Sequence, residues 1–345
     1  MGYDLSPLQK EFISGITTGC ITTIVVHPLD LIKVRLQLSA TGQGIIPNIN
    51  NIKRNRYRLV LENIIKHEKK PFGKLLTVKE IYRGLGINIL GNTIAWGLYF
   101  GLYRQSKDIL YNVYHKNNIQ DAGFYRGKEE NSTVENIIHD QKMSPIMYLS
   151  AGAISGLITS VVTNPIWVLK TRIMSTSKYA EGSYVSIIHG FKTLLEKEGL
   201  KSFWRGTLPA VLGVSQGAIY FMVYDTLKYK YSSLPHNRFV QSGKLNSKES
   251  NSKSEYKLKN LEIIGITSLS KMLSVSSVYP FQLLKSNLQS FKAVNHNYTL
   301  INLAKNIFKE KGLLGLYTGL SANLLRAIPS TCITFCIYEN FRNWI

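Results

Sequence analysis

The chain has 345 residues, with 42 Lys and Arg against 21 Asp and Glu, so its formal net charge is +21. An apolar share of 44% is too high for a disordered basic tail, and a charged share of 18% is low for a soluble protein of this length. The three cysteines are too few for a disulfide framework, and the positive charge indicates an anionic partner, which is nucleic acid, an anionic membrane surface or an anionic solute.

The chain contains three copies of one sequence pattern. Each copy starts with a proline that is followed five residues later by a lysine, at Pro28 and Lys33, Pro165 and Lys170, and Pro280 and Lys285. An aromatic residue two positions before a glycine follows, at Tyr82 and Gly84, Trp204 and Gly206, and Tyr317 and Gly319. A tyrosine four residues before a base closes each copy, at Tyr103 and Lys107, Tyr224 and Lys228, and Tyr338 and Arg342. The constant order of these landmarks predicts three repeats, over residues 9–113, 144–231 and 259–345.

Each predicted repeat holds two long apolar stretches. We expect the first helices at 11–38, 147–174 and 261–289, and the second helices at 84–110, 206–229 and 319–344. Each exceeds the roughly 20 residues that cross a bilayer core of about 30 Å. Polar residues interrupt the stretches, which a bundle around a wet cavity tolerates and a lipid-facing helix does not. The sequence predicts an all-α membrane protein with six transmembrane helices in three pseudo-symmetric repeats.

The connections between these helices are of two kinds. Amphipathic stretches at 57–70, 184–198 and 298–311 join the two helices of a repeat, and polar linkers at 116–142 and 232–259 separate the repeats. Six spans place both termini on one side of the membrane, and the positive-inside rule places the basic connection of the first repeat on the other side.

The triple pattern resembles the mitochondrial carrier family, whose three repeats each hold two tilted transmembrane helices and a short matrix helix. The family pattern Pro-x-(Asp/Glu)-x-x-(Lys/Arg) is complete only in the first repeat, because Trp167 and Gln282 stand where a carboxylate is usual. The Pro-Ile-Trp form of the second repeat and the run from Gly91 to Tyr103 resemble the branch that carries FAD, folate, NAD and pyrimidine nucleotides, and the run is most similar to the FAD and folate members.

The resemblance implies a function and a location. We expect a carrier that moves FAD across the mitochondrial inner membrane by alternating access, with folate, NAD or a pyrimidine nucleotide as the alternative cargo. Both termini would face the intermembrane space. The carrier would need no cofactor, would work as a monomer and would contact membrane lipids, including cardiolipin.

A matrix-side gate is the first functional element that the resemblance implies. Mid-helix prolines bend the helices and would draw three helix ends together. In the family the acid of one repeat pairs with the base of the next, which here implies Asp30 with Lys170. Trp167 can offer Lys285 only a cation–π contact of about 0.5–2 kcal/mol, and Gln282 can offer Lys33 only a hydrogen bond. We therefore expect a weak gate, made of Asp30, Lys33, Gln37, Lys170, Lys285 and Gln289. The alternative is that these charges merely cap helix ends at the membrane interface.

A second gate on the cytoplasmic side would use the residues that close each repeat. Asp225 is expected to pair with Arg342, and Glu339 with Lys107. Lys228 would face a base in place of the usual carboxylate.

The substrate site is expected between the two gates. Asn88, Asn92, Trp96, Tyr99 and Tyr103 fall at helical spacing on one face, which either faces the cavity or packs against neighbouring helices. The family's three contact points correspond to Gly91 with Asn92, Gly213 with Val214, and Arg326. The planar guanidinium of Arg326 suits a phosphate, and Trp96 and Tyr99 can stack on a heteroaromatic ring. Lys271 either contacts a substrate phosphate or only an acceptor on a neighbouring helix.

Two Arg-Gly pairs at the starts of second helices are candidate lipid sites. In the family these positions, here Arg83 with Gly84 and Arg205 with Gly206, bind cardiolipin, and a cation beside exposed N–H groups suits an anionic headgroup. The third repeat has Thr318 in place of the arginine, so its site would be weaker.

Other classes of protein fit the sequence less well. A nucleic-acid-binding protein would expose its aromatic residues beside its bases, whereas here the aromatic residues lie inside apolar spans. The sequence shows no Gly-rich phosphate loop, no Ser/His/Asp set and no group of metal ligands. We therefore expect neither an enzyme nor a nucleic-acid-binding protein.

Overall fold

The computed structural model describes residues 7–39, 56–65, 73–116, 145–178, 183–232, 260–291, 293, 298–327, 329–330 and 333. Every regular element in these ranges is a helix, which confirms the all-α prediction. The predicted first helices correspond to α1 (Pro7–Leu38), α6 (Pro145–Val162) with α7 (Asn164–Ser175), and α12 (Asn260–Leu288).

The three repeat prolines occupy two kinds of position in their helices. Pro28 lies inside α1 and Pro280 inside α12, whereas Pro165 lies in the first turn of α7, after a bend of 57° between α6 and α7. A proline inside a helix removes a hydrogen bond and crowds the preceding turn, while at a helix start it costs nothing. The middle repeat therefore breaks its helix where the helices of the other two repeats continue past the proline.

The second helices and the connections also lie close to their expected ranges. The second helices are α4 (Leu85–Lys116) and the pair α9 (Thr207–Gly213) and α10 (Ser215–Ser232), and residues 320–327 are helical in the third repeat. The connections are α2 (Arg56–Ile65) and α3 (Gly73–Ile81) in the first repeat, α8 (Ile187–Glu198) with the 3₁₀ helix η4 (Leu200–Trp204) in the second, and α14 (Leu300–Gly315) in the third. Most of the predicted last helix lies outside the described residues.

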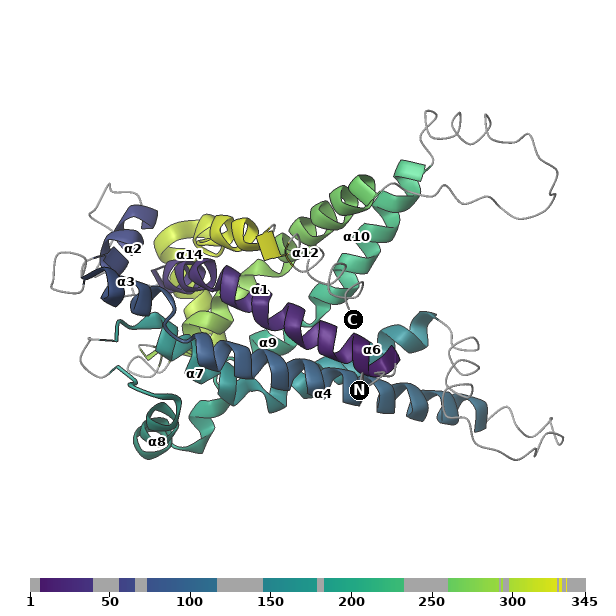
Figure 1. Ribbon diagram of the computed structural model, residues 1–345, viewed down its shortest axis with the longest axis horizontal. Helices are drawn as coiled ribbons and strands as arrows, with labels where there is room; N and C mark the ends of the chain where they lie inside the picture. Colours follow the sequence, from purple (N-terminus) through teal and green to yellow (C-terminus); the bar gives the residue numbers. More distant parts are fainter. Residues whose placement is uncertain are drawn as a thin grey trace, which may run out of the picture.

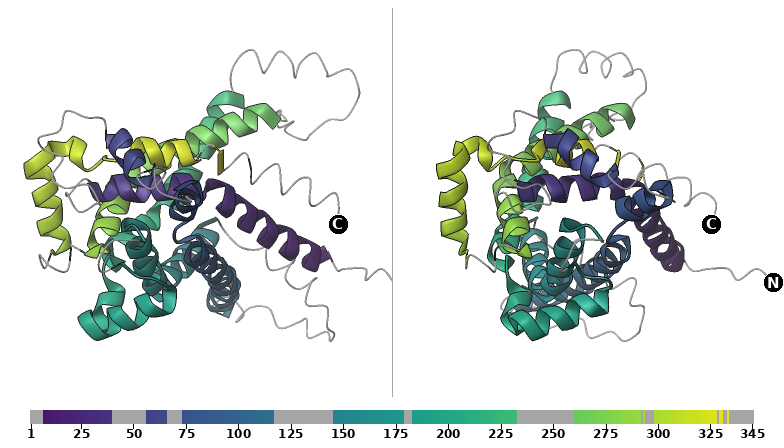
Figure 2. Two further views of the ribbon diagram at one scale, coloured as in Figure 1. Left: turned by 60° about the vertical axis from the view of Figure 1, so that its left-hand side comes forward. Right: turned by 90° about the vertical axis from the view of Figure 1, so that its left-hand side faces the viewer.

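The helices converge at one end of the molecule and diverge at the other. Figure 1 shows the connecting helices α2, α3, α8 and α14 gathered at the converging end, while α6 and α10 point apart at the opposite end. The helix α4 packs against α6, and α10 packs against α12. In Figure 2, α10 and the first half of α12 lie side by side and apart from α4.

The buried core lies at the converging end. One apolar cluster joins α1 to α2 around Leu31 and Val60, a second joins α12 to α14 around Leu283 and Leu303, and a third joins α7 to α8. Each connecting helix thus covers the C-terminal half of the first helix of its own repeat. Elsewhere large apolar side chains are exposed on the long helices, as expected for surfaces in contact with lipid.

Two helical segments of the described chain are long and apolar enough to cross a membrane, namely Gly73–Val113 and Leu200–Tyr231. The bent pair Ile146–Val162 and Asn164–Ser175 makes a third if it is one span.

Candidate functional site

Three equivalent contacts join the ends of the first helices in a ring at the converging end. In each, a side chain two residues after the repeat lysine donates a hydrogen bond to a backbone carbonyl of the next repeat. The contacts are Arg35 Nε to Met174 O at 3.3 Å, Arg172 Nε to Gln289 O at 3.1 Å, and Asn287 Nδ2 to Gln37 O at 3.2 Å. Because the third contact returns to the first repeat, the ring closes this end of the bundle.

Two of the three ring donors are also held by carboxylates, of which Glu80 is buried and Glu198 is partly buried. Arg35 pairs with Glu80 at 2.5 Å, and Arg172 pairs with both oxygens of Glu198, at 2.8 Å for Nη2. Arg172 also donates to the Tyr184 hydroxyl at 3.2 Å, and burial raises the pKa of that phenol, so it stays protonated at neutral pH. The third donor is a neutral amide, so the junction between the third and first repeats lacks this ion pair.

A glycine with positive φ lies against each acceptor residue of the ring. The φ angles are 83° at Gly84, 76° at Gly206 and 86° at Gly319. A Cβ atom would lie 2.8 Å from Met174 Cγ at Gly84, 3.1 Å from Gln289 Cγ at Gly206, and 3.4 Å from Gln37 Cγ at Gly319. Only glycine accepts this backbone angle without strain and also leaves room for the acceptor residue.

Gln37 and Gln289, two of the residues expected at the matrix gate, are buried between repeats. Gln37 accepts from Ser286 Oγ at 2.9 Å and donates to Tyr279 Oη at 3.3 Å. Gln289 accepts from Thr171 Oγ1 at 3.0 Å and donates to Asn164 Oδ1 at 3.2 Å. Both side chains therefore bridge neighbouring repeats at the closed end.

The residue before each repeat proline makes a contact that the sequence analysis did not anticipate. In each repeat this side chain donates to a carbonyl just before the positive-φ glycine. The contacts are His27 Nε2 to Arg83 O at 3.0 Å, Asn164 Nδ2 to Arg205 O at 3.1 Å, and Tyr279 Oη to Thr318 O at 2.7 Å. They fasten the first helix to the start of the second helix of the same repeat. The sequence does place a side chain with hydrogen-bonding groups before each repeat proline, and this recurrence could have predicted the contact.

The expected ion pair between Asp30 and Lys170 is wrong for this conformation. Asp30 Oδ1 instead lies 3.1 Å from Nη1 of Arg326, and Oδ2 accepts from Asn88 Nδ2 at 3.3 Å. The reason is geometric, because Arg326 approaches from the last helix and takes the carboxylate. Lys170 has its ammonium group over the ring of Trp167, 4.9 Å from the ring centroid.

In the second and third repeats, Trp167 and Gln282 occupy the position where the repeat pattern has an acid. Lys285 Nζ lies 5.8 Å from the centroid of Trp167, which confirms the expected cation–π contact. The side chain of Gln282 bonds to residues other than Lys33, because it donates to Gln216 Oε1 at 2.8 Å and accepts from Asn323 Nδ2 at 3.2 Å. Asn323 thus holds Gln282 as Asn88 holds Asp30 in the first repeat.

The predicted substrate contacts divide into packed and accessible positions. Gly91 and Val214 are packed, because Gly91 lies against Ile166 and Trp167, and Val214 lies against Gly156 of α6. Gly213 faces open space, and Trp96 is 59% exposed. Asn92 donates to Thr23 at 3.3 Å, Tyr99 stacks on Tyr103, and Lys271 Nζ lies 5.7 Å from the centroid of Tyr220.

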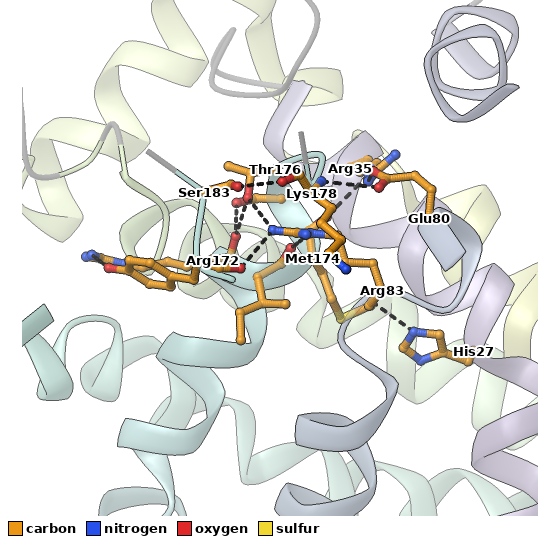
Figure 3. A network of polar contacts seen from close by, with 12 residues as sticks. His27, Arg35, Glu80, Arg83, Arg172, Met174, Thr176, Lys178 and Ser183 are labelled. Carbon is orange, nitrogen blue, oxygen red and sulfur yellow. Dashed lines mark hydrogen bonds and ion pairs between the residues drawn. The ribbon is translucent and has the colours of Figure 1, made fainter. Parts of the chain in front are cut away.

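The structure changes the interpretation of Arg83. Its side chain is only 7% exposed, and its guanidinium donates to Ile173 O at 2.7 Å, to Thr176 Oγ1 and to Tyr184 O. Figure 3 shows Arg83 below the end of α7, beside Met174 and Thr176. The expectation that Arg83 and Gly84 bind a lipid headgroup fails here, because Arg83 caps the last carbonyls of the neighbouring repeat.

The second Arg-Gly pair has a different environment. Arg205 and Gly206 line a pocket of about 330 Å³ between the start of α9 and the third repeat, together with Trp204, Thr207, Leu208, Pro209, Leu288, Tyr298 and Leu300. The pocket combines one cation with apolar walls.

The residues expected at the cytoplasmic gate are described in part. Lys107 lies on α4, with Nζ 5.6 Å from the centroid of Tyr103, and Asp225 and Lys228 lie on α10. Glu339 and Arg342 lie outside the described residues, so the pairs that include them stay predictions.

Comparison with known proteins places the chain in a family. The family model for mitochondrial carrier proteins matches residues 4–114, 141–234 and 257–345. The mitochondrial FAD carrier protein of Saccharomyces cerevisiae is 49% identical over 98% of this chain and 97% of its own length. The chloroplastic folate transporter 1 of Arabidopsis thaliana is 26% identical over 95% and 92%, and the mitochondrial nicotinamide adenine dinucleotide transporter 1 of Saccharomyces cerevisiae is 29% identical over 98% and 78%. The matches confirm the predicted fold of three repeats and six spans and the expectation of a transporter rather than an enzyme. The chain belongs to the mitochondrial carrier family.

Proposed function

We propose that this chain carries FAD across the mitochondrial inner membrane by alternating access. The supporting observation is the 49% identity, over nearly the whole of both chains, to a mitochondrial FAD carrier, against 26–29% for the folate and NAD transporters. The chemistry of the site agrees with this cargo. Arg326 and Lys271 suit its phosphates, and Trp96 and Tyr99 suit its flat rings.

The substrate site lies between the closed end and the diverging end of the bundle. Asn92, Trp96, Tyr99, Gly213, Lys271 and Arg326 supply its polar, aromatic and charged contacts, and Gly91 and Val214 shape its wall where helices meet. Gly213 carries no side chain and faces open space, which lets a planar ring approach the backbone of α9.

The two ends of the bundle serve as the two gates. The ring of carbonyl contacts, with Asp30, Lys33, Gln37, Lys170, Lys285 and Gln289, forms the matrix gate. Lys107, Asp225, Lys228, Glu339 and Arg342 form the cytoplasmic gate in this proposal. Repeats that rock around a central site expose it alternately to each side.

Uptake into liposomes tests the cargo. The purified carrier is reconstituted, and the uptake of labelled FAD, NAD, UTP and a folate is measured side by side with protein-free liposomes. We expect saturable uptake of FAD. Uptake of NAD, UTP or folate without FAD would reject the proposed cargo while leaving the carrier architecture intact. Arg326→Ala should abolish uptake in a protein that still unfolds cooperatively.

The carrier is proposed to work as a monomer with both termini in the intermembrane space. A tag at either terminus should then be cleaved by protease in mitochondria whose outer membrane has been opened. Protection of both tags until the inner membrane is dissolved would reverse the orientation. A mass of two chains for the active carrier in detergent would reject the monomer.

Cardiolipin is proposed to bind the pocket at Arg205 and Gly206. Added cardiolipin should raise the thermal unfolding temperature of the detergent-solubilised protein. Arg205→Ala should reduce this gain, whereas Lys201→Ala, which removes an exposed base from the same connection, should keep it. Equal gains in both variants would reject the pocket as the lipid site.

A further inference from the structure

A row of three amide side chains crosses from the third repeat to the second. Asn323 Nδ2 donates to Gln282 Oε1 at 3.2 Å, and Gln282 Nε2 donates to Gln216 Oε1 at 2.8 Å. Asn323 lies in the helical residues 320–327, Gln282 lies on α12, and Gln216 lies in the first turn of α10. This amide row therefore joins three helices of two repeats by uncharged hydrogen bonds.

The two ends of the amide row lie one helical turn from two of the expected substrate contacts. Gln216 follows Gly213 by three residues, and Asn323 precedes Arg326 by three residues. A Cβ atom at Gly213 would meet open space, and both Gly213 and Gln216 are half-buried. A substrate that contacts Arg326 and lies against Gly213 is therefore within reach of the Gln216 side chain.

Gln216 carries a hydrogen-bond donor that the amide row leaves unused. Its Oε1 atom accepts from Gln282, and none of the residues that the structure describes accepts a hydrogen bond from its Nε2 atom. Asn323 is only 3% exposed and fixes the amide of Gln282, which in turn fixes the amide of Gln216. The N–H groups of Gln216 are thus oriented before a ligand binds, which reduces the entropy lost on binding.

An uncharged donor at this place suits the edge of the substrate ring. Arg326 and Lys271 supply positive charge for the phosphates, and Trp96 and Tyr99 supply flat surfaces for the ring faces. The edge of the ring is the part of the substrate that none of these four residues distinguishes. A carboxamide N–H donates to a carbonyl oxygen, and the isoalloxazine ring of FAD carries carbonyl groups on one edge, whereas its adenine ring carries none.

We propose that Gln216 determines specificity by donating a hydrogen bond to a ring carbonyl of the flavin, with Gln282 and Asn323 as positioning residues. This inference rests on the proposed function, because it names the part of FAD that the carrier distinguishes. An analogue without the carbonyl oxygen leaves the Gln216 donor without its partner and binds less tightly. A flavin is therefore selected over a ring of similar size that offers no carbonyl at this edge.

The test compares the binding of FAD with that of two analogues, each with one ring carbonyl oxygen replaced by sulfur. Sulfur is a weaker acceptor, while the phosphates, the adenosine and the ring system stay the same. Wild type should bind at least one analogue about threefold or more weakly than FAD, as expected for one uncharged hydrogen bond. In Gln216→Leu the three ligands should bind equally, with about the affinity that wild type has for the weaker analogue. Gln216→Ala provides a second variant should Gln216→Leu not fold.

Two further variants separate recognition of the ring from a general effect on structure. Gln105→Leu makes the same change at an exposed glutamine of α4 and should keep the wild-type ratio of affinities for FAD and the analogue. Asn323→Ala keeps the Gln216 donor but removes the residue that orients the amide row, so this ratio should fall. A merely structural role of Asn323 would weaken the binding of all three ligands by the same factor and leave the ratio unchanged.

The outcomes distinguish the role of Gln216 from the identity of the cargo. Equal binding of FAD and both analogues by wild type would overturn the proposal, and so would a wild-type ratio of affinities in Gln216→Leu and Gln216→Ala. If wild type binds UTP instead of FAD, the proposed cargo is wrong, and UTP compared with its thiocarbonyl analogue still decides the role of Gln216. Binding of NAD alone, whose rings contain no carbonyl, or of none of these ligands would refute both proposals.

Discussion

Glu198→Gln removes one charge from a buried ion pair and keeps the size of the side chain. Its partner Arg172 is fully buried, and Glu198 itself is 13% exposed. Removing one partner of a buried pair typically costs about 3–5 kcal/mol, because the remaining charge is uncompensated. Arg172 keeps neutral acceptors at Tyr184 Oη and Gln289 O, so we expect a cost near the lower limit, about 3 kcal/mol.

The control is the same substitution at an exposed ion pair. Arg58 and Glu62 pair on the surface of α2, with side chains 67% and 43% exposed, so Glu62→Gln should cost at most about 0.5 kcal/mol. Thermal unfolding in detergent, at one scan rate, should place Glu198→Gln at least about 5 °C below Glu62→Gln. Equal unfolding temperatures would show that burial does not make the pair of Arg172 and Glu198 important for stability.

Two further predictions concern helix packing and the matrix gate. Gly19→Ala should stabilise the protein by up to about 1 kcal/mol, because a Cβ at this position meets open space. Gly156→Ala should lose that gain and about 1–3 kcal/mol more, because its Cβ would lie 2.9 Å from Val214 Cγ1. Thermal unfolding measures the difference, and equal stability of the two variants would contradict it. Trp167→Leu should lower the unfolding temperature of the ligand-free carrier, because Lys170 loses its aromatic contact, whereas Trp167→Phe should keep most of the stability. A leucine variant as stable as the phenylalanine variant would show that the cation–π contact contributes little.

The helices could be predicted from the sequence because repetition and hydropathy both locate them. The predicted range 261–289 becomes Asn260–Leu288, and 187–198 falls within the amphipathic stretch expected at 184–198. The break between α6 and α7 could not be predicted from the presence of Pro165, since α1 and α12 carry the same proline inside one continuous helix. Whether a proline bends or interrupts a helix depends on the packing around it.

The partners of site residues were harder to predict than the residues themselves. The sequence predicts Asp30 as a gate residue, but its partner is Arg326, which is distant in sequence and is predicted at the substrate site. The sequence pattern of the family gives the order of charges along each repeat. It does not give the distance between the first and the last helix, and that distance decides which cation contacts the Asp30 carboxylate.

The contrast between Arg83 and Arg205 shows why one motif can take different roles. Both precede a positive-φ glycine at the start of a second helix, and both offer their carbonyl to the residue before the repeat proline. The side chain of Arg83 reaches the last carbonyls of α7, whose unpaired acceptors attract a cation, and it becomes buried there. The side chain of Arg205 lies instead in a pocket against the third repeat. The backbone therefore follows the threefold pattern at these positions, while the neighbouring repeat decides whether the cation fastens two repeats together or lines a pocket.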